Sequence, residues 1–300
     1  MHTNGMAPVS TRPDPEENPL DELLEQAATL GEEGRWDEAR DLLLEELEDH
    51  PEDPALLCSL GVASRELGSD GEAYEFFRRT LAAEPQDPFI LATAGNGVAV
   101  YDDPDAESAL RLAAITAPDL AFARVSYGAY LAREGMFDDA VRELEAARGL
   151  TPEGAAEEVV VRAELAIAYL LAGRRDDGIA ELEEALAADA EDAWLRGLFG
   201  MALLEAGRSE EAAEALHRAA AERPGDMEAQ LLSALASAGE GWEDEAWNAL
   251  ARAELSAEEM DAALLQEVEE VIGTGPDEAR EFLATQLAPT VLRERLLQRP

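Results

Sequence analysis

Residues 200–224 read GMALLEAGRSEEAAEALHRAAAERP, and they contain most of one copy of the unit from which the chain is built. Gly207 interrupts an apolar segment, Ala212 lies at the start of a second one, and Pro224 ends it. Glycine favours the turn after a helix, whereas proline cannot continue a helix interior. The stretch therefore predicts two helices joined by a short turn, each with one apolar side.

The position of Ala212 recurs along most of the chain. Small residues in matching surroundings are separated successively by 34, 33, 34, 38, 34, 34 and 33 residues. They are Ala39, Ala73, Ala106, Ala140, Gly178, Ala212, Ala246 and Ala279. A second series, in the first helix of each unit, comprises Ala27, Gly61, Ala94, Gly128, Ala166, Gly200 and Ala234. This interval indicates an array of helix pairs, in which backbones approach closely only where no bulky side chain lies between them.

These units resemble the tetratricopeptide repeat family. The resemblance is carried by a glycine-x-aromatic turn such as Gly135-Met136-Phe137, the following alanine Ala140, and the closing proline Pro152. It extends over residues 20–255 in seven units, and Ala279 marks a degenerate eighth. It implies an all-α fold, a right-handed superhelical solenoid of about sixteen antiparallel helices plus a terminal one.

The same pattern divides the chain into three segments. Residues 1–19 contain four prolines and no helical period, which predicts a disordered N-terminal tail. Residues 20–289 form the predicted solenoid of about seven repeats plus the eighth. Residues 290–300 are predicted to be a C-terminal capping helix that covers the last repeat with apolar side chains.

Two units depart from the pattern. In the third unit, Gly95 and Gly97 occupy the first helix, where glycine costs about 1 kcal/mol relative to alanine, so we expect a weak joint there. Between the fourth and fifth units four extra residues lie around 151–158, which predicts a longer loop rather than a domain boundary.

The composition is strongly acidic. The 67 acidic residues outnumber the 23 basic ones, all of them arginine, so the net charge is −44. Such a charge argues against direct binding to nucleic acid or to an anionic membrane, and it permits basic partners. The interpretation that the charge supports better is a halophile-like protein whose acidic surface serves solubility. The absence of an apolar leader or of a long apolar segment predicts a cytoplasmic protein.

The residues that commonly carry chemistry are few and scattered. His2, His50 and His217 have no metal-ligand spacing, and Cys58 has no evident base beside it. The acidic run 102–107 lacks the spacing and the glycine of a calcium-binding loop. We therefore predict no enzyme activity, no cofactor and no metal site.

The resemblance implies that the first helices line a concave groove. The predicted groove residues are Phe122, Val125, Ala129, Val160, Ile167, Trp194, Leu198, Met201, Leu231 and Leu235. They are mostly apolar, and Trp194 is the expected anchor because tryptophan is frequent at binding hot spots. The lysines with which chaperone-binding members hold a carboxylate are missing, so that activity is not implied. Two interpretations stay open: an exposed groove, or side chains that pack inside the superhelix or under the terminal segment.

The favoured hypothesis is a scaffold or adaptor that binds a peptide or an amphipathic helix in this groove, with acidic rims selecting basic flanks. The alternative is a structural protein that uses the same surface to form homo-oligomers. A third hypothesis, an acidic nucleic-acid mimic that binds a basic protein, is supported only by the charge.

Overall fold

A computed structural model describes residues 19–297 of the chain. The described residues are almost wholly helical and contain no β-strand, which confirms the predicted all-α class. Residues 1–18, which make up nearly all of the predicted tail, and residues 298–300 lie outside the described residues.

The helices of the seven predicted units follow one another in order. Their bounds are α1 Pro19–Glu32, α2 Trp36–Leu47, α3 Pro54–Glu66, α4 Asp70–Ala82, α5 Pro88–Ala99, α6 Asp105–Thr116, α7 Ala121–Arg133, α8 Phe137–Leu150, α9 Glu158–Leu171, α10 Arg175–Ala188, α11 Ala193–Glu205, α12 Ser209–Glu222, α13 Met227–Gly239 and α14 Glu243–Ser256. The odd-numbered helices are the first helices of the pairs, and the even-numbered ones are the second helices.

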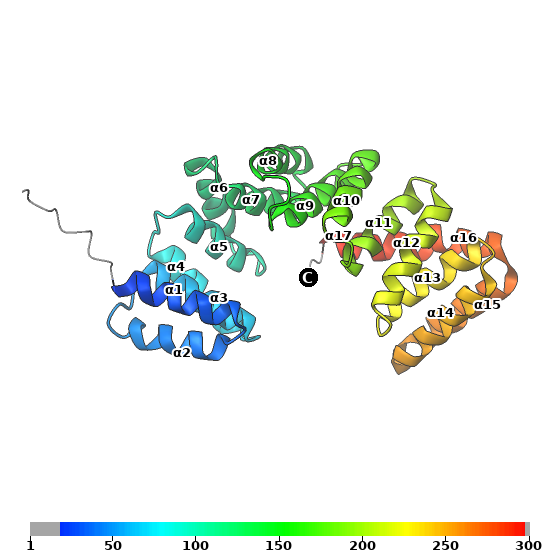
Figure 1. Ribbon diagram of the computed structural model, residues 1–300, viewed down its shortest axis with the longest axis horizontal. Helices are drawn as coiled ribbons and strands as arrows, with labels where there is room; N and C mark the ends of the chain where they lie inside the picture. Colours follow the sequence, from blue (N-terminus) through cyan, green and yellow to red (C-terminus); the bar gives the residue numbers. More distant parts are fainter. Residues whose placement is uncertain (1–18, 298–300) are drawn as a thin grey trace, which may run out of the picture. The chain divides into compact units, whose positions relative to one another are not determined.

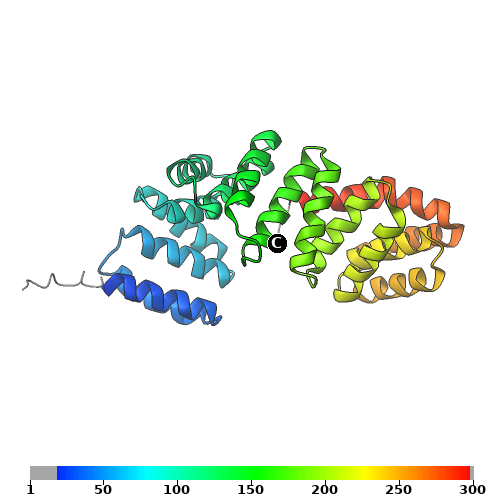
Figure 2. The ribbon, with the colours of Figure 1, turned by 45° about the horizontal axis from the view of Figure 1, so that its top comes forward.

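Most first helices pack against the second helix of their own pair, as Figures 1 and 2 show for α3 with α4 and for α11 with α12. Second helices also pack against the next first helix, for example α8 against α9 and α12 against α13. The chain divides into two compact units, of which unit 1 ends at Ala113 and unit 2 begins at Ala114. The division lies within α6, in the third helix pair. One solenoid-like stack of helix pairs is therefore found in each unit.

The predicted turn glycines have the backbone conformation that requires them. Gly135, Gly207 and Gly241 all have φ between 77° and 78°, a left-handed conformation that side chains disfavour. In the third pair, where the turn glycine is missing, Asp102 takes this role with φ of 54°. The start of several first helices is also fixed by an aspartate, as in α11, where Asp192 accepts a hydrogen bond of 2.9 Å from the Leu195 N–H.

The two series of small residues lie at the helix contacts, as predicted. The alanines of both series that lie in the seven pairs are 4% exposed or less. An added Cβ at Gly61 would lie 2.6 Å from the ring of Phe77, and one at Gly200 would lie 2.7 Å from Leu216. Real Cβ contacts do not occur at such distances, so the helix pairs depend on small residues at these places.

Gly95 and Gly97 are also packing residues, a role that the sequence did not predict. A Cβ at Gly95 would lie 2.9 Å from Leu110 of α6. A Cβ at Gly97 would lie 2.1 Å from the ring of Phe77 in α4. The two glycines therefore let neighbouring helices of unit 1 approach closely, a benefit that helix propensity alone does not show.

We expect Gly97→Ala to destabilise unit 1 by about 1–3 kcal/mol, because the added methyl group overpacks the Phe77 ring. Helix propensity alone predicts the opposite sign, a gain of about 1 kcal/mol. Gly71→Ala, where the added Cβ meets nothing within 4 Å, is the control. Hydrogen exchange read on peptides of unit 1 measures both, and a more protected Gly97→Ala protein would contradict the packing role.

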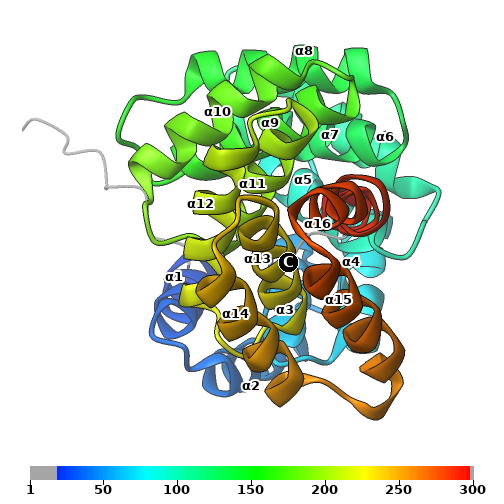
Figure 3. The ribbon, with the colours of Figure 1, turned by 90° about the vertical axis from the view of Figure 1, so that its right-hand side faces the viewer.

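The C-terminal part returns along the first helices of unit 2. A 3₁₀ turn at Glu259–Asp261 leads into α15 Ala262–Thr274 and α16 Pro276–Phe282, which continue through the π-helical turn η2 Leu283–Leu287 into α17 Ala288–Leu297. α16 and η2 pack against α13, and α17 packs against α11 (Figure 3). α17 thus packs on the sixth pair, and α16 and η2 pack on the seventh, whereas the sequence predicted that residues 290–300 would cover the last repeat. Residues 276–297 are called the C-terminal segment below.

Candidate partner-binding face

The first helices of unit 2 place equivalent residues in rows along one face. Because the repeat interval is nearly constant, Val160, Trp194 and Glu228 follow one another at 34-residue steps in α9, α11 and α13. Gly197 and Leu231 belong to the neighbouring row by the same spacing. We call these rows of α7, α9, α11 and α13 the inner face of unit 2.

The predicted groove residues on α7 and at the start of α9 are partly accessible. Phe122, Val125 and Ala129 of α7 are half-buried. Val160 of α9 is 57% exposed, although its side chain is wholly apolar. Trp194 of α11 is half-buried and packs against the large apolar cluster of unit 2.

The remaining five predicted groove residues are buried to 1% exposure or less, namely Ile167, Leu198, Met201, Leu231 and Leu235. They belong to one apolar cluster together with Leu283, Val291 and Leu292 of the C-terminal segment. On α11, on α13 and at Ile167 of α9, the predicted groove is therefore covered by packing and is not open. The physical reason is that the chain supplies its own apolar helix to cover the inner face of α11 and α13.

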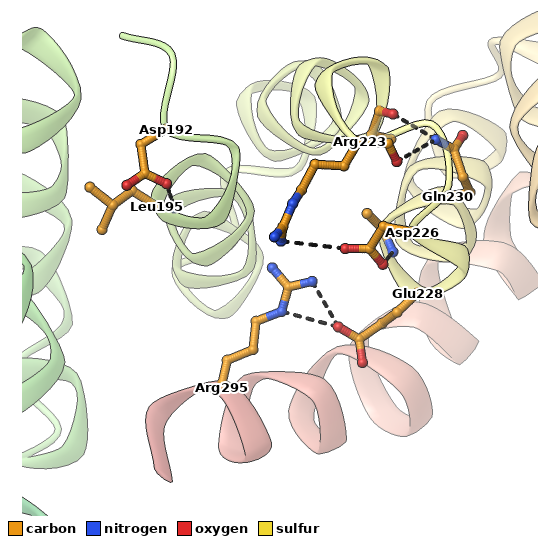
Figure 4. A network of polar contacts seen from close by, with 9 residues as sticks. Asp192, Leu195, Arg223, Asp226, Glu228, Gln230 and Arg295 are labelled. Atoms are coloured by element: carbon orange, nitrogen blue, oxygen red, sulfur yellow. Dashed lines mark hydrogen bonds and ion pairs between the residues drawn. The ribbon is translucent and has the colours of Figure 1, made fainter. Parts of the chain in front are cut away.

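Sequence reasoning missed the polar residues of the inner face. Arg295 of α17 donates to Oε1 of Glu228 through Nε at 3.0 Å and through Nη2 at 2.7 Å (Figure 4). The 34-residue spacing from Val160 and Trp194 could have indicated Glu228, but the predicted groove was apolar and Glu228 is charged. Nothing in the spacing indicates Arg295, since it lies outside the repeats.

A buried polar network fixes the start of α9, and with it Val160. Arg162 pairs with Glu158 at 2.9 Å and with Glu181 of α10 at 2.8 Å. The Gly154 N–H, in the predicted long loop, donates to Oε2 of Glu158 at 2.6 Å. This backbone hydrogen bond and the Arg162 guanidinium hold the pKa of Glu158 below its usual range. The inserted residues therefore form a loop anchored to the helix that follows it.

A second network joins α8 to α9. The Tyr169 hydroxyl donates to Oε1 of Glu145 at 2.7 Å, and the Arg174 guanidinium lies over the Tyr169 ring, 4.2 Å from its centre. Burial, together with the hydrogen bond to Glu145, raises the pKa of Tyr169 to about 12. These contacts connect neighbouring repeats.

The acidic run 102–107 has structural partners. The Tyr74 hydroxyl donates to Oδ2 of Asp103 at 2.9 Å, and Arg78 lies 3.7 Å from the same carboxylate. Oδ1 of Asp103 accepts the backbone N–H of Asp105 at the start of α6. Among residues 19–297, no group of three His, Cys, Asp or Glu side chains is arranged to hold a metal ion.

Family profiles match the chain in both units. Two profiles, each described as a tetratricopeptide repeat, match residues 24–88 and residues 170–238. Together with the paired helices and the small residues at their contacts, these matches decide the family. The chain is a tetratricopeptide repeat protein.

The chain is also similar to solved structures, and the first two named here share its fold. A chain of the APC/C hetero-tetramer Cut9–Hcn1 is 19% identical with a TM-score of 0.65, over 85% of this protein and 50% of that chain. A tetratricopeptide repeat protein from Parabacteroides merdae is 16% identical with a TM-score of 0.58, over 84% and 98% of the two chains. A thermophilic tetratricopeptide repeat protein of Thermus thermophilus is 28% identical with a TM-score of 0.49, over 61% and 98%. No curated protein sequence matches the chain.

Tetratricopeptide repeat proteins are generally non-catalytic scaffolds that bind protein or peptide partners. In the described part of this tetratricopeptide repeat protein, no helix has both the length and the apolar character needed to cross a bilayer.

The thiol of this tetratricopeptide repeat protein is expected to be unreactive. Cys58 lies buried in α3, and burial raises the pKa of its thiol to about 12. Because the thiolate is the reactive form, a disulfide reagent at about pH 8 should modify the folded protein about a hundredfold or more slowly than the unfolded one. Absorbance of the released thiol measures both rates, and equal rates would show that α3 opens readily.

Proposed function

We propose that the chain is a non-catalytic scaffold or adaptor that binds an amphipathic helix, or an extended apolar peptide with basic flanks, on the inner face of unit 2. The observation that carries the proposal is the C-terminal segment, an apolar helix bearing arginines that lies on α11 and α13. A face that accepts such a helix in cis has the shape and the charge to accept one in trans.

The accessible part of this face is the binding surface that we propose. Phe122, Val125 and Ala129 on α7 and Val160 on α9 occupy the same rows as the residues that α17 and η2 cover further along. An exposed apolar side chain of this kind gains free energy when a partner removes it from water. The net charge of −44 favours partners whose apolar residues are flanked by arginine or lysine.

The experiment uses two labelled model helices, one of leucine and lysine and one of leucine and glutamate. The full chain at physiological ionic strength is expected to bind the lysine peptide and to gain hydrogen-exchange protection in α7 and α9. Val160→Asp should weaken that binding by about tenfold, although it adds a negative charge that by itself would attract the peptide.

Leu255→Asp is the matched control, because Leu255 is also apolar and is even more exposed than Val160, but it lies at the end of α14, away from the inner face. Equal binding by both variants would mean that the peptide is held by charge alone, and the proposed surface would be wrong. If the chain instead self-associates through the same face, a measurement of its molecular mass in solution will give more than one chain. Val160→Asp should then return the mass to that of a single chain.

A further inference from the structure

In the ion pair between Arg295 and Glu228, the surroundings of both side chains favour the contact. The guanidinium makes two hydrogen bonds to one carboxylate oxygen, and the Arg295 side chain is only 11% exposed. Glu228 lies in the first turn of α13, where the positive end of the helix dipole also favours a carboxylate. Figure 4 shows Arg295 directed from α17 across to this turn, next to Arg223, which pairs with Asp226 at 3.5 Å. Two acids at the start of α13 therefore receive two arginines.

Gly197 provides the space for the guanidinium. A Cβ added at Gly197 would lie 2.5 Å from Nη1 of Arg295. The equivalent residues of the pairs before and after, Ala163 and Leu231, are larger. Glycine in the middle of α11 lowers helix stability, so its presence here is explained by the arginine that lies over it. Arg295 is a flexible side chain, which means that a methyl group at this place would displace the guanidinium without disturbing the helix contacts.

Apolar contacts fix where this arginine lies along the helix. Val291, Leu292 and Leu296 of α17 are buried in the cluster that includes Leu198 and Met201 of α11. At the other end of the C-terminal segment, Arg280 lies over Gly239 and 3.7 Å from Glu240. The segment is thus held by an apolar side and by two arginines, each placed over a glycine and beside a glutamate.

From this geometry we propose that Gly197 and Glu228 form a subsite for one arginine of an apolar helical partner, a subsite that Arg295 fills in cis. The inference rests on the proposed function and makes it more specific. A partner helix that replaces α17 carries leucine, isoleucine or valine on one side and an arginine in the place of Arg295. Arginine suits the subsite better than lysine, because its guanidinium donates two hydrogen bonds to the carboxylate through Nε and Nη2 while Nη1 lies over the glycine.

The test uses the full chain with Leu292→Asp, which places a charge in the apolar contact of α17 and releases that helix from α11. The probe is a fluorescent peptide with the sequence of residues 286–300, and the matched probe carries Arg295→Gln. Fluorescence polarisation is expected to show about tenfold tighter binding of the arginine peptide. The difference should vanish in chains that also carry Glu228→Gln or Gly197→Ala. It should persist with Glu240→Gln, which changes the other arginine contact.

The outcomes separate this inference from the proposed function. If both peptides bind equally well, the arginine subsite is wrong, while an apolar groove stands. If neither peptide binds although the leucine–lysine helix binds at α7 and α9, the subsite is wrong and the proposed function stands. Circular dichroism checks that Leu292→Asp keeps its helices. If the variant loses its helices, the same peptides are titrated into the unmodified chain. There the tethered α17 competes with the peptide at about millimolar effective concentration. The arginine peptide must still bind more tightly than the glutamine peptide.

Discussion

Phe77→Ala is expected to lower the free energy of unfolding of unit 1 by about 3–5 kcal/mol. Phe77 is 1% exposed, and its ring fills the space above two glycines, Gly61 in its own pair and Gly97 in the next one. Removing the ring leaves a cavity that neither glycine can fill, because neither has a side chain. Since whole domains are stable by only about 5–15 kcal/mol, this single change removes a large part of the stability of unit 1.

Phe76→Ala is the matched control, since Phe76 is the same residue type one position earlier and is only half-buried beside Arg79. It should cost about 1 kcal/mol, as expected when a partly exposed ring is lost. Hydrogen exchange of peptides from α3, α4 and α5 measures the local stability of both proteins. Similar losses for the two variants would show that the ring of Phe77 does not connect these helix pairs.

Arg162→Met is expected to cost unit 2 about 2–3 kcal/mol, because it leaves two poorly hydrated carboxylates without their shared cation. The three side chains of this network are only 12–13% exposed. The cost stays below that of a fully isolated charge because Arg148 still lies 3.2 Å from Glu181. Arg142→Met, which removes an exposed arginine of α8, should change stability by less than about 0.5 kcal/mol.

The effect of Arg162→Met should also depend on pH. The pKa of Glu158 is lowered in the folded state, so its contribution to stability is present above the unfolded value of about 4.3 and is lost as the pH falls through the folded pKa. Arg162 is one cause of that lowering, and its removal brings the folded pKa closer to the unfolded one. The stability difference between the two proteins should therefore shrink as the pH falls below about 4. Urea unfolding at several pH values measures it, and a constant difference would contradict the assigned role of Glu158.

The residues on which the repeat pattern depends were predictable because they act locally and recur. A residue such as Ala212 or Gly207 meets the same neighbours in every pair, so seven copies of one weak signal identify the helices, their turns and the places where backbones meet. The packing role of Gly95 and Gly97 was not predicted. Helix propensity is visible in the sequence, whereas the approach of Leu110 and Phe77 is not.

The inner face shows what the sequence determined and what only the tertiary structure decided. Spacing placed Val160, Trp194 and Leu231 in rows on the first helices, because the helical period and the repeat length fix which residues share a face. Part of this face is covered because α17 returns to α11. This return brings Arg295 to Glu228 across 67 residues of chain. A contact between a repeat and a segment outside the repeats has no period. It forms because an apolar helix tethered beside an apolar face gains free energy by leaving water, and only the folded chain shows which face that is.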